Sequence, residues 1–88
     1  MRLDRYLFFI RLVKSRTLAQ ALIEAGNVRV DGKRVSKASE EVRAGSVIAL
    51  PLHGKVRVLR IHSLPDRRGP APEARTHYQE IDGEGGPT

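Results

Sequence analysis

The sequence predicts a small α+β fold, in which two packed N-terminal helices are followed by a small, mostly antiparallel sheet. Apolar residues recur at helical spacing between Leu3 and Ile23, and an Asp-Gly pair separates two short alternating segments. Two further apolar runs, after residue 46, have the length of strands. With 88 residues the chain has room for one domain with a thin core.

The first helix is expected to begin at Leu3. One apolar stripe runs along it at helical spacing, formed by Leu3, Tyr6, Leu7, Ile10 and Val13. Asp4 lies in the first turn, where a negative charge suits the positive end of the helix dipole.

The second helix is expected to begin after Ser15, whose side chain is a good N-cap. Gly26 is the residue expected to end it in a left-handed conformation. Lys14 and Arg16 flank its N-terminus. Its apolar face is formed by Leu18, Ala19, Leu22 and Ile23.

A β-hairpin is predicted over residues 28–35, because Asp31-Gly32 is a favoured two-residue turn between alternating segments. A strand at 47–50 follows a turn at 42–46, and Pro51 either stops this strand or puts it on a sheet edge. Lys55 to Ile61 is a further strand.

The composition changes at Pro65. We expect a domain over residues 1–64 with its core motif in 1–50, then a Pro-rich link and a short helix over 65–82. The helix is predicted over Glu73–Ile81, with Ala74 and Tyr78 on one side. Residues 83–88 are expected to be disordered.

The charge indicates a polyanionic partner. There are 16 basic residues, 12 of them arginine, against 10 acidic ones, for a net charge of +6. Residues 1–68 hold 15 basic and 6 acidic residues, a net of +9, whereas residues 69–88 carry −3. Nucleic acid is the first expectation and an anionic membrane surface the second.

The compartment is expected to be the cytoplasm. Cysteine is absent, which excludes disulfides and thiolate metal sites and favours a reducing environment. The longest apolar run is too short to cross a bilayer, and the N-terminal residues do not resemble a signal peptide.

Enzymatic function is not expected. His53, His62 and His77 lack the spacing of a zinc site, and the sequence contains no Gly-rich phosphate loop. Glu40 and Glu41 are adjacent, so they point apart instead of forming an acid–base pair. We therefore expect no catalytic residues, metal, cofactor or small-molecule substrate.

A basic patch is the remaining candidate site. Free N–H groups and the dipole make the N-terminus of the second helix attractive to anions. Around it and on the hairpin lie Arg11, Lys14, Ser15, Arg16, Gln20, Arg29, Lys33, Arg34 and Lys37. If the hairpin packs beside the helix, these residues form one patch that binds a phosphate backbone by its shape. The alternative is that these charges only solvate the surface.

The order of motifs resembles the RNA-binding domain of ribosomal small-subunit protein four, called the alpha-L motif. The matching motifs are Arg2-Leu3-Asp4, Ser15-Arg16, the spaced residues from Ala19 to Gly32, and Val42-x-x-Gly45. The resemblance implies that Arg2, Arg11, Lys14, Ser15, Arg16 and Gln20 lie on the RNA-facing helix surface, with Lys33 and Arg34 at the hairpin tip. It implies that Leu3, Leu7, Leu18, Leu22, Ile23, Val28 and Val30 are core. For Asp4, an ion pair that orients Arg2 or Arg16 and a plain dipole role both stay open.

A narrower resemblance is to the ribosome-associated heat-shock protein 15 family. It is carried by Arg2 to Phe8 with Arg11, by Arg67-Arg68-Gly69-Pro70-Ala71-Pro72-Glu73-Ala74, and by Tyr78-Gln79-Glu80. This resemblance implies binding to ribosomal RNA of the large subunit and rescue of large subunits that carry peptidyl-tRNA after stalled translation. Peptidyl-tRNA is thus a second candidate partner, and we expect a monomer.

Two other functions stay open. The same domain is fused to pseudouridine synthases and some methyltransferases, so the chain is alternatively an RNA-binding accessory of a modification enzyme. A general binder of DNA or membrane surfaces that uses bulk charge alone is the third possibility.

Overall fold

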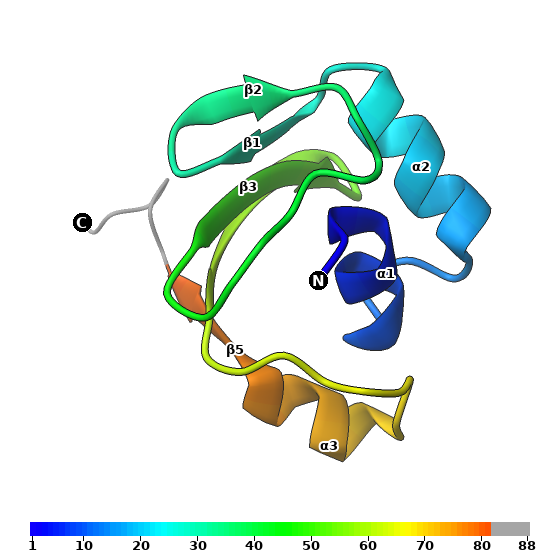
Figure 1. The fold of residues 1–88 in the computed structure, drawn as a ribbon, viewed down its shortest axis with the longest axis vertical. Coiled ribbons are helices and arrows are strands. Elements are labelled where there is room, and N and C mark those ends of the chain that lie inside the picture. Colours follow the sequence, from blue (N-terminus) through cyan, green and yellow to red (C-terminus); the bar gives the residue numbers. More distant parts are fainter. Residues whose placement is uncertain (82–88) are drawn as a thin grey trace.

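The computed structural model describes residues 1–81, whose strands form one five-stranded antiparallel sheet in the order β2-β1-β3-β4-β5 (Figure 1). The strands are β1 (Val28–Val30), β2 (Lys33–Val35), β3 (Val47–Leu52), β4 (Lys55–Ile61) and β5 (Tyr78–Ile81). With the helices described below, this arrangement confirms the predicted α+β fold.

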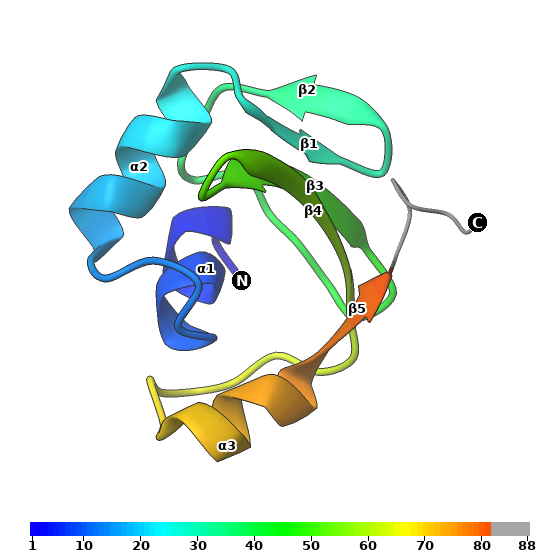
Figure 2. The same cartoon turned by 180° about the vertical axis from the view of Figure 1, so that it is seen from behind.

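Helix α1 (Leu3–Phe9) lies in the middle of the molecule, between α2 and the sheet (Figures 1 and 2). Leu3, Tyr6 and Leu7 are fully buried. The chain between β2 and β3 covers the start of α1, since the amide of Leu3 donates to the Glu40 carbonyl at 2.7 Å. Burying three large apolar side chains contributes on the order of 5 kcal/mol, so α1 anchors the core.

The apolar stripe of α1 is shorter in the structure than the sequence predicts. The helix ends at Phe9, with Ile10 as its C-cap, and does not continue to Val13. Arg11 adopts a left-handed conformation with φ of 66°, which breaks the helical path. Val13 is still buried, but it reaches the core from the connection between the helices.

Helix α2 (Arg16–Glu24) has the predicted ends. The Ser15 hydroxyl accepts a hydrogen bond from the Leu18 amide at 3.1 Å, and Gly26 has a φ of 81°. Ala19 and Ile23 are buried against the core. The prediction that Leu18 is core is wrong, because α2 buries the side that carries Ala19 and leaves Leu18 50% exposed. None of the helices within residues 1–81 has the length and apolar character needed to cross a bilayer.

The structure confirms the β-hairpin predicted over residues 28–35. Asp31 and Gly32 have φ of 52° and 84°, as the favoured two-residue turn requires. The Asp31 carboxylate also accepts from the Val47 amide at 2.9 Å, which fixes the turn to the start of β3.

Pro51 does not stop β3, which continues to Leu52. Strand β1 pairs with β3 only at Ile48 and Ala49, whereas β4 pairs along its whole length. Pro51 therefore lies where β3 has a neighbour on one side only, which is the edge position that tolerates a missing N–H.

The predicted helix over Glu73–Ile81 is wrong for most of its length. The structure has α3 (Ala71–Ala74), the 3-10 helix η1 (Arg75–His77) and then β5. Tyr78 pairs with Ile61 and so adds a strand at the edge of β4, which local helical spacing cannot reveal. The disorder predicted for residues 83–88 lies outside the described residues.

The segment before α3 is fastened to the connection between α1 and α2. The Arg68 Nε donates to the Phe8 carbonyl at 3.0 Å and its Nη2 to the Val13 carbonyl at 3.4 Å. The guanidinium also lies 4.5 Å from the centre of the Phe8 ring. In return, the Arg11 Nε donates to the Gly69 carbonyl at 2.6 Å. We call this set of contacts the Arg68 clamp.

Replacing Arg68 by alanine should lower the free energy of unfolding by about 2 kcal/mol, because two charge-assisted hydrogen bonds and the contact with Phe8 are lost. Urea unfolding followed by circular dichroism measures the change. Arg67→Ala is the matched control. Arg67 is 63% exposed and forms a surface ion pair with Glu73, so its loss should cost only about 0.5 kcal/mol. Equal losses in both variants would contradict the clamp.

Candidate nucleic-acid interface

A buried carboxylate organises the corner where α1 and α2 meet. Asp4 has no exposed surface, and both of its oxygens accept hydrogen bonds. Oδ1 accepts from the Arg2 Nε at 3.1 Å and from the Arg5 amide at 2.8 Å. Oδ2 accepts from the Arg16 Nη2 at 3.1 Å, the Gln20 Nε2 at 3.0 Å and the Arg2 Nη2 at 3.2 Å. We call Asp4 with Arg2, Arg16 and Gln20 the Asp4 cluster.

The cluster keeps Asp4 ionised. Burial alone raises the pKa of a carboxyl group, but the hydrogen bonds from Gln20, Arg2 and Arg16 outweigh burial and hold the pKa of Asp4 below its ordinary value of 3.8. The negative charge is therefore present at neutral pH and holds two guanidinium groups in fixed directions. Of the two roles left open for Asp4, the structure shows the ion pairs with Arg2 and Arg16.

The two arginines keep donors for a ligand. The side chains of Arg2 and Arg16 are 42% and 36% exposed, so a ligand in solvent can reach both of them. Within the described residues, the buried Nε of Arg16 lacks an acceptor. An unsatisfied buried donor costs about 1–3 kcal/mol, which partly offsets the stabilisation from the bond between Arg16 and the buried Asp4 carboxylate.

Other predicted site residues surround the cluster. Lys14 is exposed and directly precedes Ser15, the N-cap of α2. Lys37 is exposed next to Ala38, whose carbonyl accepts from the Asp4 amide at 3.2 Å. The set that we call the α1–α2 corner consists of Arg2, Lys14, Ser15, Arg16, Gln20 and Lys37.

The remaining predicted residues lie elsewhere. Arg29 and Arg34 are cross-strand neighbours on the hairpin, and Arg34 packs beside Gly26 at the other end of α2. Lys33 pairs with Val30, on the opposite face of the hairpin from Arg34. Arg11 is turned toward Gly69 by the Arg68 clamp. The basic residues thus form a corner at one end of α2 and an arginine pair at its other end.

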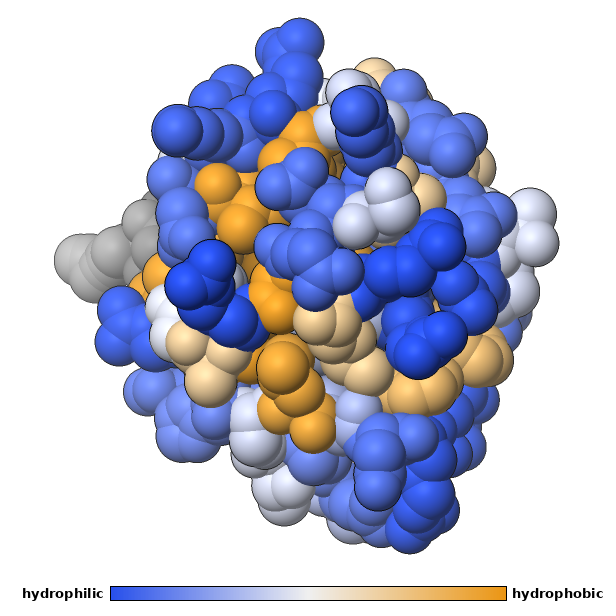
Figure 3. All heavy atoms as spheres, viewed as in Figure 1, coloured by the Kyte–Doolittle hydropathy of each residue, from blue (hydrophilic) through white to orange (hydrophobic). Residues whose placement is uncertain are grey.

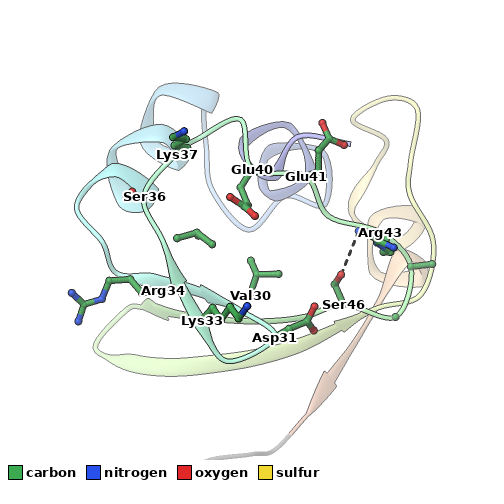
Figure 4. Close-up of a pocket in the computed structure, with 13 residues that line it drawn as sticks. Val30, Asp31, Lys33, Arg34, Ser36, Lys37, Glu40, Glu41, Arg43 and Ser46 are labelled. Carbon is green, nitrogen blue, oxygen red and sulfur yellow. Dashed lines mark hydrogen bonds between the residues drawn. The ribbon is translucent and has the colours of Figure 1, made fainter.

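A hollow of about 810 Å³ lies between the hairpin and the chain that follows it (Figure 4). Lys33 and Arg43 line it, but so do Asp31, Glu40 and Glu41. The Arg34 side chain extends away from this hollow, while the Glu40 carboxylate points into it. Because acidic and basic groups are mixed, this hollow is a poor site for a phosphate. On the face drawn in Figure 3, hydrophilic side chains surround a narrow apolar strip.

Two contacts were not predicted from the sequence. Arg68 is one, and the only signal for it is its place in the Arg67-Arg68-Gly69 motif. The other is between the Ser63 Oγ and the His77 Nδ1, 2.7 Å apart. Within residues 1–81, the His77 ring has no hydrogen bond to a carboxylate. The backbone carbonyl of His77 accepts a hydrogen bond from the Tyr6 hydroxyl at 3.0 Å. We interpret this contact as a structural link between β4 and η1.

Metal ligands are not gathered in the described part of the chain, where no three histidine, aspartate or glutamate side chains lie close enough to hold an ion.

The fold and the corner define a class of protein: a small α+β module in which one buried carboxylate fixes cationic side chains on a pair of helices.

Comparison with known proteins identifies the family. The S4 domain family model matches residues 1–48. The heat shock protein 15 homolog of Haemophilus influenzae is 37% identical over 82 residues, which cover 93% of this chain and 62% of the relative. The RQC P-site tRNA stabilizing factor of Bacillus subtilis is 33% identical over 66 residues, which cover 75% of this chain and 76% of that protein.

A solved structure agrees. The trimeric structure of Vibrio cholerae heat shock protein 15 has a TM-score of 0.89 and 35% identity, and the match covers 94% of this chain and 83% of the other. The chain belongs to the S4-domain family and, within it, to the heat shock protein 15 homologues. It spans 62% of the H. influenzae relative and 59% of the Escherichia coli K12 one.

Proposed function

We propose that this protein is a non-catalytic RNA-binding protein whose α1–α2 corner binds ribosomal RNA of the large ribosomal subunit. The observation that carries the proposal is the Asp4 cluster, in which one buried carboxylate holds Arg2 and Arg16 in place before any ligand arrives. Guanidinium groups match phosphate oxygens in a two-pronged geometry, and a fixed guanidinium loses little entropy on binding.

The dimensions suit a structured RNA backbone. The nine residues of α2 span about 14 Å at the rise of an α-helix, from Arg16 and its neighbour Lys14 to the hairpin arginines beside Gly26. Two groups of cations at this separation reach more than one phosphate of a strand. Contacts of this kind recognise shape and backbone, which is how double-stranded RNA is mainly recognised.

The names of the relatives support the choice of partner. The matches include heat shock protein 15 homologues, a protein named RQC P-site tRNA stabilizing factor and a small ribosomal subunit protein, uS4. We therefore infer that this chain acts in the cytoplasm in the rescue of large subunits that carry stalled peptidyl-tRNA, with the peptidyl-tRNA as a second partner.

Sucrose-gradient sedimentation of the protein with purified ribosomal subunits tests this proposal. The wild type should sediment with large subunits at moderate salt. Arg16→Ala should weaken binding about 10-fold and lower the slope of log affinity against log salt by about one unit. Arg60→Ala is the matched control: Arg60 is exposed on β4 between the buried Leu59 and Ile61, so it faces away from α1 and should leave binding unchanged.

Three outcomes would contradict the proposal. Protein that stays at the top of the gradient at low salt does not bind ribosomal subunits. Equal losses in the Arg16 and Arg60 variants, with duplex DNA as an equal competitor, indicate a binder that uses only bulk charge. Capture of a pseudouridine synthase or methyltransferase without affinity for RNA indicates the accessory function.

A further inference from the structure

A second hollow, of about 820 Å³, lies beside the α1–α2 corner. Its lining includes Leu18 and Leu22 of α2 and Leu52 at the end of β3, together with the cationic side chains of Arg11, Lys14 and Arg68. Figure 2 shows α2, the connection after α1 and the start of α3 along this side of the molecule. We call this hollow the leucine groove.

The groove has a one-sided charge. Its described lining contains two arginines, one lysine and His53, but no aspartate or glutamate. Most of its lining residues are apolar, and Leu18 is 50% exposed although it lies within a regular helix. An apolar lining that also holds cations suits a ligand that has a flat apolar body and a negative group, which is the chemistry of a nucleotide.

We propose that the leucine groove receives one unpaired nucleotide of the RNA that is bound at the α1–α2 corner. The base lies against Leu18 and Leu22, and its phosphate lies at Lys14 and Arg11. This inference rests on the proposed function, because Lys14 belongs to both the corner and the groove. An RNA strand held by the corner therefore passes the mouth of the groove, and an unpaired base is the part of an RNA that can leave the stack to enter it.

A protein segment fits the same surface less well. An apolar helix laid on Leu18 and Leu22 would cover Arg11 and Lys14 without giving them a negative partner, and burying unpaired charges is costly. A nucleotide brings its own phosphate. The positive charge of the groove and its continuity with the corner through Lys14 both favour RNA.

Two RNA duplexes test the proposal, identical except that one carries a single bulged 2-aminopurine nucleotide. The wild type should bind the bulged duplex about 10-fold more tightly, and 2-aminopurine fluorescence should change on binding. Leu18→Ser should remove this preference while affinity for the perfect duplex stays the same, and Leu18→Met should keep it. Val56→Ser is the matched control, because Val56 is also 50% exposed but does not line the groove, so it should keep the preference.

The outcomes separate this inference from the proposed function. Tight binding of both duplexes without a preference for the bulge, or a preference that survives Leu18→Ser in a folded variant, overturns the groove proposal and leaves RNA binding intact. Failure of the wild type to bind either duplex overturns the proposed function itself. A third outcome concerns an acidic amphipathic peptide that binds at Leu18. If this peptide at saturation displaces no RNA, the groove is assigned to a protein partner instead.

Discussion

Replacing Asp4 by alanine should lower the affinity for structured RNA about 100-fold, although it raises the net charge from +6 to +7. Bulk charge alone predicts the opposite, a gain in affinity. The loss is expected because Arg2, Arg16 and Gln20 all donate to this one carboxylate and lose their fixed directions together. Preorganisation, and not the number of charges, then determines the affinity.

Glu24→Ala is the control for charge. Glu24 is an exposed acid on the same α2 helix, so its removal changes the net charge equally without touching the Asp4 cluster. Affinity should stay the same or rise about twofold, in line with a modest long-range effect. Fluorescence anisotropy with a labelled RNA hairpin measures both variants, and a rise in affinity for Asp4→Ala would show that the cluster has no function in binding.

The Asp4→Ala variant should also be less stable than the wild type, by about 2–4 kcal/mol, because a fully buried acceptor of several hydrogen bonds is removed. Asp4→Asn keeps the shape of the side chain and removes only the charge. If alanine leaves too little folded protein at 25 °C, asparagine should still give a reduced affinity in the same assay. Circular dichroism shows that the molecules compared are folded.

Low pH should remove the extra stability that the wild type has over the Asp4→Asn variant. The pKa of Asp4 is lowered in the folded protein from its ordinary value of 3.8, so ionised Asp4 stabilises the fold above that value. The difference in unfolding free energy between the two proteins should be constant, at about 2 kcal/mol, from pH 7 to about pH 5. It should then shrink as the pH falls from 3.8 through the folded-state pKa below it.

Urea titrations of both proteins at pH 7, 5, 4 and 3 measure this difference, and the paired comparison cancels the titration of the other acids. A difference that grows toward low pH would mean that burial has a larger effect on the pKa of Asp4 than the hydrogen bonds from Gln20 and the two arginines. A difference that stays flat down to pH 3 would show that folding does not change the titration of Asp4.

The features that could be predicted from the sequence are those set by local chemistry. Ser15 caps α2 and Gly26 ends it because a hydroxyl acceptor and a left-handed glycine satisfy helix ends in any context. Asp31-Gly32 makes its turn for the same kind of reason. Lys55–Ile61 was predicted with the bounds that β4 has.

The features that could not be predicted depend on partners distant in sequence. Tyr78 and Ile81 have helical spacing with Ala74, but β5 forms because the edge of β4 is there to pair with. Leu18 belongs to the apolar face of α2 by its spacing, yet the core extends only as far as Ala19 and Ile23. In both cases the surroundings outweigh the local preference.

The candidate site divides in the same way. The presence of Arg2, Arg16 and Gln20 near one another follows from the motif, but only the structure shows that they share the oxygens of Asp4. The separation of Lys33 from Arg34 follows from strand alternation once the register is known. Which of the ten predicted residues contact RNA stays a prediction.

The Arg68 clamp has a consequence for any attempt to transplant this domain. The S4 domain match ends at residue 48, inside β3, and the arginine that holds the helix connection in place comes later in the chain. A graft of residues 1–48 onto another protein would carry every side chain of the α1–α2 corner but none of the contacts that Arg68 makes with Phe8 and Val13. A transplanted unit therefore has to extend beyond the S4 domain match and include Arg68.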